Sequence, residues 1–551
     1  MDGGRENFSP QTDLRDFLAA AEEAGQLEKV NGAHWDKEMG AVVEVLYRER
    51  VEKAKAVLFD KVPGYPEGFR CLYGMLASPF RLALAVGMDT ELSTDRFALL
   101  NAYRKKMFNH EPIPPRIVEN GPILENILEG DEIDITKLLP VPVHHELDGG
   151  RYIGTACGVV TRDPDNGRVN SGTYRCMVHD GQTLGVMISN GKQGNIQRAK
   201  YFAKGEPCPA TIVVGVDPTH FLAARMTIPD DVDEFAFQGG LAGKPIDLIV
   251  GDNGLPFPAH SEIVIEGEQV PDEERMEGPF GEWTGYYAGD AEMDPIFKIK
   301  KVYYRSNPIL TCAASQKPPH SHLFERCFTR SVTLLEGLQK AGVQDVRGVW
   351  HHEAGSGRTF VVVSIKQRFY GHATQAGLMA SQLNPATYCG RYTVVVDEDI
   401  DAANLHDVVW AMGTRSDPAR DITHLSQCQS SRLDPMHEEE TLFNNRDKSK
   451  CITCHLKGEK GVRLGPDLTW IGVIRSERDL LEAIVFPSAS IARYHEVVNI
   501  ATTDGKVVSG LLIKETVDKM YLSSAEGVVQ SVPYREIEEA RYSDTSLMPD
   551  G

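Results

Sequence analysis

The sequence lacks any run of 18 or more apolar residues, so it predicts no membrane-spanning helix. It also lacks an excess of positive charge, because 58 Lys and Arg residues stand against 79 Asp and Glu residues, a formal net charge of −21. This balance argues against nucleic-acid binding and against adsorption to anionic membranes. The polar, acidic start of the chain has neither the basic region nor the apolar stretch of a secretory signal, which favours a cytoplasmic location.

Clustered cysteines are also scarce. Of the 10 cysteines, only Cys451 and Cys454 lie close together, and the others are dispersed singly. Such dispersal is typical of reduced, packed thiols rather than of a disulfide framework, which agrees with a cytoplasmic location for the segment before them. The dispersed cysteines are Cys71, Cys157, Cys176, Cys208, Cys312, Cys327, Cys389 and Cys428.

The length of 551 residues and an apolar content of 41% predict several domains of mixed α/β and α+β class. Helical and strand-like patterns alternate in the first and third segments, which predicts two α/β domains, the second with parallel strands. Apolar runs bounded by turn residues predict a β-rich region between them, and a charge-dense run indicates a linker further on. The expected boundaries are 1–115, 116–306, 307–437, a linker at 438–450, and a compact domain at 451–551.

Two carboxylates, Glu277 and Glu282, flank a Gly-Pro-Phe-Gly turn that fits neither regular helix nor regular strand. Taken singly, both would more often be acids on a surface loop, but the aromatic-rich segment that follows favours positioned acids. Asn170 and Arg175, within Asn-Ser-Gly-Thr-Tyr-Arg, add an amide and a guanidinium. Glu234 adds a third carboxylate.

These residue types together suit a phosphate-bearing cofactor and an anionic substrate. A side-chain amide and a carboxylate are oxygen ligands that magnesium or manganese accepts when it bridges a phosphate. Arg175 offers a two-pronged grip on a carboxylate or phosphate. A pair of glutamates beside an arginine can divide into an ionised and a protonated member, which creates a general acid at neutral pH. The spacing does not name the reaction.

Residues from about 11 to 437 resemble the UbiD-type reversible decarboxylases, which use prenylated flavin mononucleotide (FMN). The motifs that carry this resemblance include Asp148-Gly-Gly-Arg-Tyr-Ile153, Asn170-x-Gly-x-Tyr-Arg175, Asp233-Glu-Phe-Ala-Phe-Gln-Gly-Gly240, Glu277-Gly-Pro-Phe-Gly-Glu282 and Thr414-Arg-x-Asp-Pro-Ala-Arg-Asp421. The resemblance implies a split β-barrel flavin-binding core flanked by α/β domains, and a homo-oligomer. It also implies an aromatic or α,β-unsaturated carboxylic acid as substrate and a flavin prenyltransferase as supplier of the cofactor.

By the same resemblance, Arg175, Glu277 and Glu282 form the catalytic network. Glu282 is the proton donor to the carbon that loses carbon dioxide. Asn170 and Glu234 are ligands of a divalent metal, Mn²⁺ or Mg²⁺, that holds the cofactor phosphate. The cofactor-binding residues that the resemblance implies are Asn170, Ser171, Thr173, Arg175 and Glu234.

One residue departs from the family pattern, because the family has a histidine as a further metal ligand where this sequence has Gln193. A glutamine carbonyl is a weak ligand for manganese or magnesium, and K⁺ is a further candidate ion. The change is also compatible with weakened metal binding or an inactive member. Glu262 is an alternative carboxylate ligand, or else a surface acid at a strand edge. His320 and His322 either face the substrate or lie in a surface loop.

Cys451-Ile-Thr-Cys454-His455 is the attachment motif of c-type haem. The two thiols add to the haem vinyl groups, and His455 becomes the proximal ligand of the iron. A zinc site would need a second Cys/His pair at ligand spacing, and none follows. Met548, in Ser-Leu-Met-Pro, is the candidate sixth ligand or else an ordinary apolar residue. Residues from about 450 to 551 resemble a small cytochrome-c-like family with a β-rich insertion, which implies haem c and Met548 as the distal ligand.

The two resemblances disagree about location, because covalent haem attachment normally occurs outside the cytoplasm. Three interpretations follow from this conflict. The chain is a decarboxylase with an appended module, or an electron-transfer protein with a degenerate decarboxylase half, or a junction of two domains without a joint function. We favour the first. The substrate and the direction of the reaction are not readable from the sequence.

Overall fold

The computed structural model describes residues 13–548 apart from 50–53, 190, 227, 229–231, 427, 431–432, 437–442, 444–449, 459 and 525–527. Most of the linker predicted at 438–450 therefore lies outside the described residues. The chain divides into two compact units, Met1–Pro435 and Met436–Gly551. Within the described residues, no helix combines the length and the apolar character that crossing a membrane requires.

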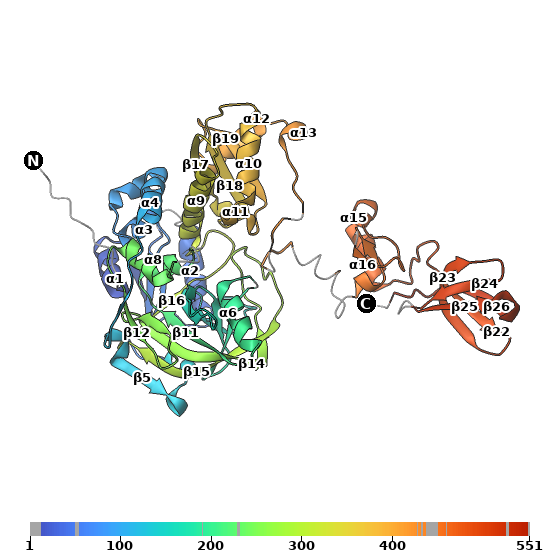
Figure 1. Ribbon diagram of the computed structural model, residues 1–551, viewed down its shortest axis with the longest axis horizontal. Helices are drawn as coiled ribbons and strands as arrows, with labels where there is room; N and C mark the ends of the chain where they lie inside the picture. Colours follow the sequence, from blue (N-terminus) through green and yellow to red (C-terminus); the bar gives the residue numbers. More distant parts are fainter. Residues whose placement is uncertain are drawn as a thin grey trace, which may run out of the picture. The chain divides into compact units, whose positions relative to one another are not determined.

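A nine-stranded antiparallel sheet forms the centre of the first unit and curls into a half-barrel (Figure 1). Its order is β6-β9-β10-β15-β14-β11-β7-β8. The strand β5 pairs with the C-terminal part of β15, residues 301–304. The strands are β5 (Asn126–Glu129), β6 (Arg151–Gly154), β7 (Cys157–Arg162), β8 (Val169–Gly172), β9 (Arg175–Val178), β10 (Thr183–Met187), β11 (Cys208–Val214), β14 (Ile263–Glu277) and β15 (Glu292–Tyr304).

This sheet separates two hydrophobic cores, because successive side chains of a strand point to opposite faces. Along β11, Val213 packs into one core, whereas Ile212 and Val214 pack into the other. Short helices lie beside the sheet: α5 (Ile135–Leu138), α6 (Gln193–Phe202), α7 (Pro218–Ala224) and α8 (Glu234–Ala242). A separate three-stranded sheet has the order β13-β12-β4 and consists of β4 (Arg116–Ile117), β12 (Asp247–Val250) and β13 (Pro256–Pro258).

A mixed four-stranded sheet, in the order β1-β2-β3-β16, belongs to the N-terminal part of this unit. Its strands are β1 (Leu27–Asn31), β2 (Ala56–Asp60), β3 (Arg70–Tyr73) and β16 (Ile309–Cys312). The accompanying helices are α1 (Leu14–Glu23), α2 (Glu38–Glu49), α3 (Pro79–Ala85) and α4 (Arg96–Asn109). Because β16 follows the large sheet in the sequence but pairs with β3, the chain returns here to its N-terminal part.

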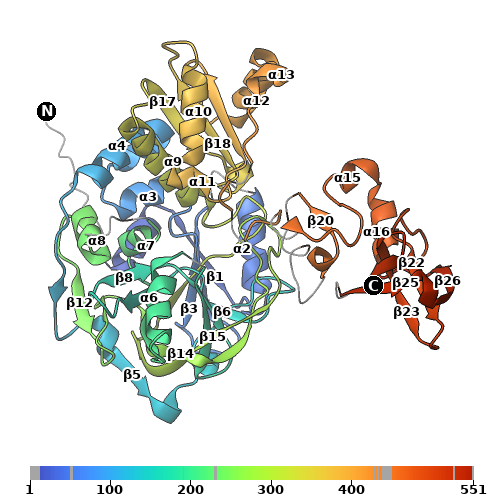
Figure 2. The same cartoon turned by 45° about the vertical axis from the view of Figure 1, so that its right-hand side comes forward.

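The remaining α/β part of the first unit has a three-stranded sheet in the order β17-β18-β19. The strands β18 and β19 pair in parallel, as the sequence predicted, whereas β17 is antiparallel. Figure 2 shows this part at the end of the unit opposite β5. Its elements are α9 (Leu323–Lys340), β17 (Val346–His351), β18 (Phe360–Ile365), α10 (His372–Gln382), α11 (Asn384–Thr387), β19 (Tyr392–Asp397), α12 (Leu405–Arg415) and α13 (Pro418–Asp421).

The second unit contains a five-stranded antiparallel sheet in the order β25-β24-β23-β22-β26. Its core is small, with Val498, Ile500 and Leu522 as central members. The described elements are β20 (Leu456–Lys457), β21 (Lys460–Gly461), α15 (Ile471–Ile474), α16 (Glu477–Val485), β22 (Val497–Thr502), β23 (Val507–Glu515), β24 (Lys519–Ser523), β25 (Val529–Pro533) and β26 (Ile537–Ser543).

Candidate active site

Arg175 joins the two predicted acids into one network. Its Nε and Nη2 atoms donate to the two carboxylate oxygens of Glu277 at 2.9 and 2.6 Å, and Nη1 donates to Oε1 of Glu282 at 2.7 Å. The carboxylates are buried, with side-chain exposures of 3% and 8%. The Tyr152 hydroxyl also donates to Glu277, at 3.3 Å. Both glutamates are therefore positioned acids rather than acids of a surface loop.

The glycine-rich segment near residue 149 holds the acidic turn in place. Gly278 has φ +88°, a left-handed conformation that favours glycine. The Gly149 N–H donates to the Pro279 carbonyl at 2.8 Å, and the Gly281 N–H donates to Asp148 Oδ1 at 2.8 Å. A Cβ atom at Gly149 would lie 2.0 Å from the Gly278 carbonyl oxygen. The Asp-Gly-Gly motif is thus a clamp that fixes Glu282 relative to Arg175.

Burial and neighbouring charges shift the pKa values of Glu282 and Arg175. Burial raises the pKa of the Glu282 carboxyl above its ordinary value, although the guanidiniums of Arg175 and Arg326 oppose the shift. Burial alone would lower the pKa of Arg175, but the carboxylates of Glu277 and Glu282 outweigh it and raise that pKa. Arg175 therefore stays charged, while Glu282 holds its proton to a higher pH than an ordinary glutamate does. This is the arrangement of a general acid beside a fixed cation.

The predicted metal ligands gather around the Tyr174 hydroxyl. Gln193 opens α6, and the next N–H, of Gly194, donates to Tyr174 Oη at 3.1 Å. Asn170 hydrogen-bonds the same hydroxyl, and the Glu234 carboxylate lies within its electrostatic reach. Burial raises the pKa of Tyr174, so the phenol stays neutral. The Asn170 amide and the Glu234 carboxylate thus approach one hydroxyl beside the start of α6, and oxygen atoms of these two kinds are ligands for a hard divalent cation.

The other predicted cofactor contacts lie on the same strand and turn. The Ser171 hydroxyl is 3.2 Å from Nε2 of His220 and is buried. Thr173 is half-buried between β8 and β9. Among the described residues, no group of three or more His, Cys, Asp or Glu side chains has the arrangement of a metal site. The candidate ligands near Tyr174 include side-chain amides, which do not count in such a group. The metal therefore remains a prediction.

Sequence reasoning missed a group of basic side chains beside Glu282. The guanidinium carbons of Arg326 and Arg358 lie 5.5 and 5.1 Å from the ring centre of Trp283, the residue after the acid. Lys192, next to Gln193, lies over Tyr388, and so does Arg358. In the sequence, only Trp283 could have been connected with the site, because it directly follows Glu282. The arginines stand alone and belong to no motif.

Several buried polar atoms here have no hydrogen-bond partner in the described part of the chain. They include Trp283 Nε1, Arg326 Nε and Nη1, Arg358 Nε and both ring nitrogens of His320. Buried donors are normally satisfied by protein groups, ordered water or a ligand, so this set offers hydrogen bonds to a polar ligand. A cofactor with an anionic phosphate and a ring rich in acceptor atoms fits these donors and the oxygen ligands around Tyr174.

His320 and His322 are buried, at 2% and 7% exposure, so the surface-loop interpretation is wrong. Their ring centres are 4.1 Å apart. Burial lowers the pKa of each imidazole well below its ordinary value, which keeps both rings neutral. They lie within electrostatic reach of Arg326 and thus belong to the same basic group.

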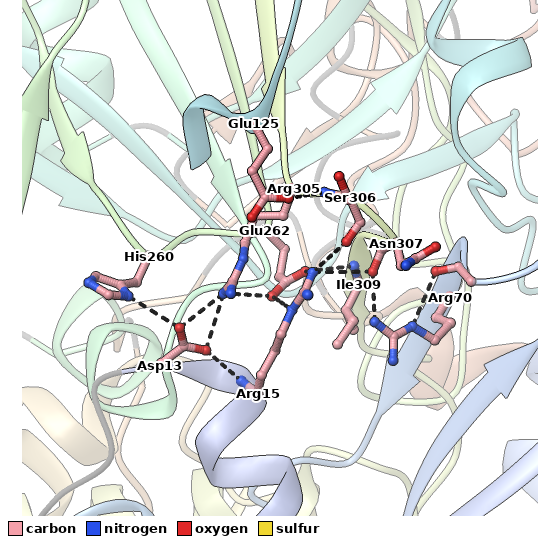
Figure 3. A network of polar contacts seen from close by, with 11 residues as sticks. Asp13, Arg15, Arg70, Glu125, His260, Glu262, Arg305, Ser306, Asn307 and Ile309 are labelled. Atoms are coloured by element: carbon pink, nitrogen blue, oxygen red, sulfur yellow. Dashed lines mark hydrogen bonds and ion pairs between the residues drawn. The ribbon is translucent and has the colours of Figure 1, made fainter. Parts of the chain in front are cut away.

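Glu262 is neither a metal ligand nor a surface acid. Its side chain is fully buried and accepts two hydrogen bonds of 2.8 Å from Nε and Nη2 of Arg15 (Figure 3). Arg305 adds a contact of 3.2 Å to Glu262 and also binds Asp13, the N-cap of α1. With both carboxylate oxygens engaged, Glu262 ties the first helix to the large sheet and has a structural role.

In the second unit, a backbone carbonyl fixes the imidazole of His455 through a hydrogen bond. Its Nδ1 lies 2.8 Å from the Pro466 carbonyl oxygen, which selects the tautomer that leaves Nε2 as the lone-pair nitrogen. Cys451 and Cys454 are half-buried and not in a disulfide. The Met548 N–H donates to Ser546 Oγ at 3.1 Å. Haem attachment and the methionine ligand remain predictions.

Similar proteins of known class define the family of this chain. Three family models match consecutive segments of the chain: the N-terminal domain of 3-octaprenyl-4-hydroxybenzoate carboxy-lyase (UbiD) at 18–99, its Rift-related domain at 116–318 and its C-terminal domain at 325–454. The chain is 32% identical over 463 residues to the pyrrole-2-carboxylic acid decarboxylase of Pseudomonas aeruginosa, covering 80% of this chain and 90% of that one. It is 31% identical to the phenolic acid decarboxylase of Sedimentibacter hydroxybenzoicus, with 77% and 88% coverage.

Solved structures agree with this assignment. The vanillic acid decarboxylase of Sedimentibacter hydroxybenzoicus in its open form matches with a TM-score of 0.69 at 30% identity, over 77% of this chain and 89% of that one. An evolved dimeric form of HmfF from Pelotomaculum thermopropionicum, solved with prenylated FMN, matches with a TM-score of 0.66 at 28% identity, over 77% and 95%. The chain belongs to the UbiD family, and it is a carboxy-lyase, that is, a decarboxylase.

Proposed function

We propose that the first unit catalyses the reversible, non-oxidative decarboxylation of an aromatic or α,β-unsaturated carboxylic acid with prenylated FMN. The observation that carries this proposal is the buried bridge from Arg175 to Glu277 and Glu282 beside unsatisfied donors. The named substrates of the relatives, pyrrole-2-carboxylic acid and phenolic acids, support the substrate class. Bound prenylated FMN supplies the electron sink for the carbon–carbon cleavage, a task that side chains do not perform well.

In this proposal, each member of the network has one task. Glu282, with its raised pKa, holds the proton and delivers it to the carbon that has lost carbon dioxide. Arg175 orients Glu282 and stabilises the carboxylate that remains after proton transfer. Glu277 anchors the other side of the guanidinium through two hydrogen bonds, so the fork cannot rotate away.

The residues around Tyr174 would hold the phosphate end of the cofactor. Asn170, Gln193 and Glu234 supply oxygen ligands for Mn²⁺ or Mg²⁺, with K⁺ as a further candidate. The Ser171 hydroxyl contacts Nε2 of His220 at 3.2 Å and keeps further hydrogen-bonding capacity for the phosphate. Thr173 lies at the turn between β8 and β9. A flavin prenyltransferase would supply the cofactor, and we expect a homo-oligomer in the cytoplasm.

The test is carbon dioxide release by the full chain, produced together with a flavin prenyltransferase. Pyrrole-2-carboxylate and 4-hydroxybenzoate are offered separately, and the Glu282→Gln variant is the matched control. We expect release from at least one acid by the native chain and a loss of at least about 100-fold in the variant. Equal release by both proteins, or none from a protein that binds prenylated FMN, would contradict the proposal.

A second candidate function, haem binding by the second unit, is supported by two observations. The bond from His455 to the Pro466 carbonyl prepares Nε2 for a metal. Large apolar side chains of the α15–α16 region are exposed, among them Trp470 at 70%, Ile474 at 71% and Leu481 at 62%. A haem bound beside His455 would cover exposed apolar side chains of this kind. A haem spectrum that survives denaturation in native protein, but not in the double variant Cys451→Ala with Cys454→Ala, tests this function.

A further inference from the structure

Two helices that carry predicted metal ligands each carry a buried glutamine one turn further on. In α6, Gln193 is followed by Gln197, and in α8, Glu234 is followed by Gln238. Residues four apart on a helix lie on the same face. Gln197 and Gln238 are 1% and 0% exposed, although amide side chains are mostly found at the surface. Each amide therefore needs hydrogen-bond partners inside the protein.

The partners of Gln238 begin at Asp217, which caps α7. Oδ1 of Asp217 accepts from the N–H groups of Thr219 and His220 at 2.9 and 3.2 Å, and from the Thr219 hydroxyl. Oδ2 accepts from Nε2 of Gln238 at 2.7 Å, and that nitrogen also donates to the Thr219 hydroxyl at 3.3 Å. Both hydrogens of the amide are thus engaged. The carboxylate fixes the orientation of Gln238, because it would repel the carbonyl end of the amide.

The same direction of hydrogen bonding continues through His220 to Ser171. Oε1 of Gln238 lies 3.0 Å from Nδ1 of His220 and is an acceptor, so Nδ1 carries the hydrogen. Burial lowers the pKa of the imidazole, which keeps it neutral, so Nε2 accepts from the Ser171 hydroxyl at 3.2 Å. The ring also stacks on Phe235, the neighbour of Glu234. This Gln238 relay therefore ties Ser171 in β8 to the helix that carries Glu234.

A second set of bonds, the Gln197 relay, orients the amide of Asn170. Nε2 of Gln197 donates to the Arg168 carbonyl at 3.4 Å, so Oε1 faces the Thr161 hydroxyl and accepts from it at 2.6 Å. With its hydrogen engaged there, the Thr161 oxygen accepts from Nδ2 of Asn170 at 3.3 Å. A reversed Asn170 amide would place two acceptor oxygens against each other. The carbonyl end, Oδ1, is then the end of Asn170 that remains for a cation.

Both relays end on consecutive residues of one edge strand. Asn170 and Ser171 are neighbours in β8, the last strand of the large sheet, and their side chains leave opposite faces. The Gln197 relay therefore holds β8 from the face of α6, and the Gln238 relay holds it from the face of α7 and α8. The sequence leaves room for the second relay at Gly158, where a Cβ atom would lie 2.8 Å from Nε2 of His220. The buried hydrogen bonds thus fix β8 between the two helices.

We propose that Gln197 and Gln238 are positioning residues of the predicted metal site, through which α6 and α8 hold Asn170 and Glu234 at the spacing that one divalent cation requires. This inference rests on the decarboxylase function proposed above, because that function places the cation and the cofactor phosphate there. Neither glutamine is itself a ligand in this proposal. Loss of side chains that orient metal ligands typically lowers metal affinity by about 10- to 100-fold.

Metal affinity without turnover tests this role. The full chain is loaded with unmodified FMN, and Mn²⁺ is titrated with detection by electron paramagnetic resonance. In Gln238→Met, which keeps the side-chain length but removes the amide, the Mn²⁺ affinity should fall at least about tenfold, and the spectrum of bound Mn²⁺ should change with it. Gln197→Met should give a loss of the same order. Gly158→Ala keeps every polar group of the relay but crowds His220, so it should lower the affinity as well.

Tyr303→Phe is the matched control, because its buried hydroxyl donates at 2.8 Å to Glu266, which is not a predicted ligand. It removes one buried hydrogen bond between two strands of the same sheet. The melting temperature should fall, while the Mn²⁺ affinity should change by less than about twofold. An equal loss of affinity in this control would assign the effect to general loosening of the sheet and overturn the proposal. Unchanged affinity in both Met variants, or a native chain that binds no Mn²⁺, would overturn it as well.

A double variant separates positioning from stability. If Gln238 acts by placing Glu234, then Gln238→Met should cost less than about twofold in Mn²⁺ affinity once Glu234→Gln is present, because the two changes remove the same contact with the ion. A full tenfold loss in that background would contradict the role assigned to Gln238.

The two proposals fail in different ways. Mn²⁺ binding that depends on both glutamines, without carbon dioxide release after loading with prenylated FMN, would leave the positioning role and remove the reaction. Carbon dioxide release by a native chain whose Mn²⁺ affinity is the same in both Met variants would leave the reaction and remove the positioning role.

Discussion

Arg175 and Glu282 are 107 residues apart in the sequence, yet Nη1 of the arginine lies 2.7 Å from Oε1 of the glutamate. The same guanidinium holds Glu277 through its other edge. One cation therefore serves two buried acids, and burial raises the pKa of Glu282 above its ordinary value. A raised carboxyl pKa is what a proton donor requires.

Replacing the proton donor should abolish turnover without loss of structure. In Glu282→Gln the amide still accepts a hydrogen bond from Arg175 but has no acidic proton, so kcat should fall at least about 100-fold. Single-turnover kinetics with prenylated FMN measures the loss. Flavin affinity and the melting temperature should stay close to native values, and a large drop in either would show a structural role instead.

Shortening the bridge should separate geometry from charge. In Arg175→Lys a single ammonium cannot reach both glutamates in the present geometry, so kcat should fall by about two orders of magnitude while the charge remains. Arg175→Met should in addition lower the free energy of unfolding by about 3 kcal/mol, since two buried carboxylates lose their cation. Urea denaturation compares the two variants. Equal stability of both would argue against a buried ion pair.

The pH dependence should follow the raised pKa of Glu282. The protonated carboxyl is the active form, so kcat/KM should fall as pH rises through the folded-state pKa, which lies above the ordinary glutamate value. Protonation is also favoured by folding, so any stability from this group is present at low pH and lost as pH rises through that pKa. Measuring kcat/KM from acidic to alkaline pH checks the expected fall in rate. Residual activity of Glu282→Gln should lack this descending limb.

The metal site should respond to the residue that departs from the family pattern. Gln193→His replaces a weak amide ligand by an imidazole, so the affinity for Mn²⁺ should rise on the order of tenfold. Glu234→Gln removes the negative ligand and should lower it. Titration of Mn²⁺ into FMN-loaded protein, followed by electron paramagnetic resonance, measures both. If neither variant changes the affinity, the ion does not bind around Tyr174.

Glu262 should matter for stability and not for turnover. Glu262→Gln leaves the half-buried guanidinium of Arg15 and the more deeply buried one of Arg305 without this carboxylate, so the free energy of unfolding should fall by about 3 kcal/mol while kcat per folded molecule is unchanged. The exposed pair of Lys37 and Glu146 offers a control, because Glu146→Gln should cost less than about 1 kcal/mol. A loss of kcat in correctly folded Glu262→Gln would show that Glu262 takes part in the active site.

Some features of the site were predictable because they are local. The glycines of the acidic turn and the clamp at Asp148 are written as short motifs, and the backbone there adopts the conformations that such motifs require. The family resemblance extended this to Arg175, because it names residue types at fixed places. Burial of the individual side chains was not readable. Glu262 and the histidine pair show this, since a charged or polar residue in a turn-rich segment is normally exposed.

The amino-acid sequence was sufficient to predict the parallel pairing of β18 with β19 and the carboxy-lyase family, and to single out Arg175, Glu277 and Glu282 as candidate reacting groups. Folding was needed to show which groups meet. Two strands, β10 and β15, lie between β9 and β14, so in a flat sheet Arg175 and Glu277 would be about 14 Å apart. The curl of the sheet, with irregular pairing along β14, closes that distance. Curvature of this kind arises from the packing of the whole sheet and has no short sequence signature, and neither does the approach of the Arg326 guanidinium to the Trp283 ring.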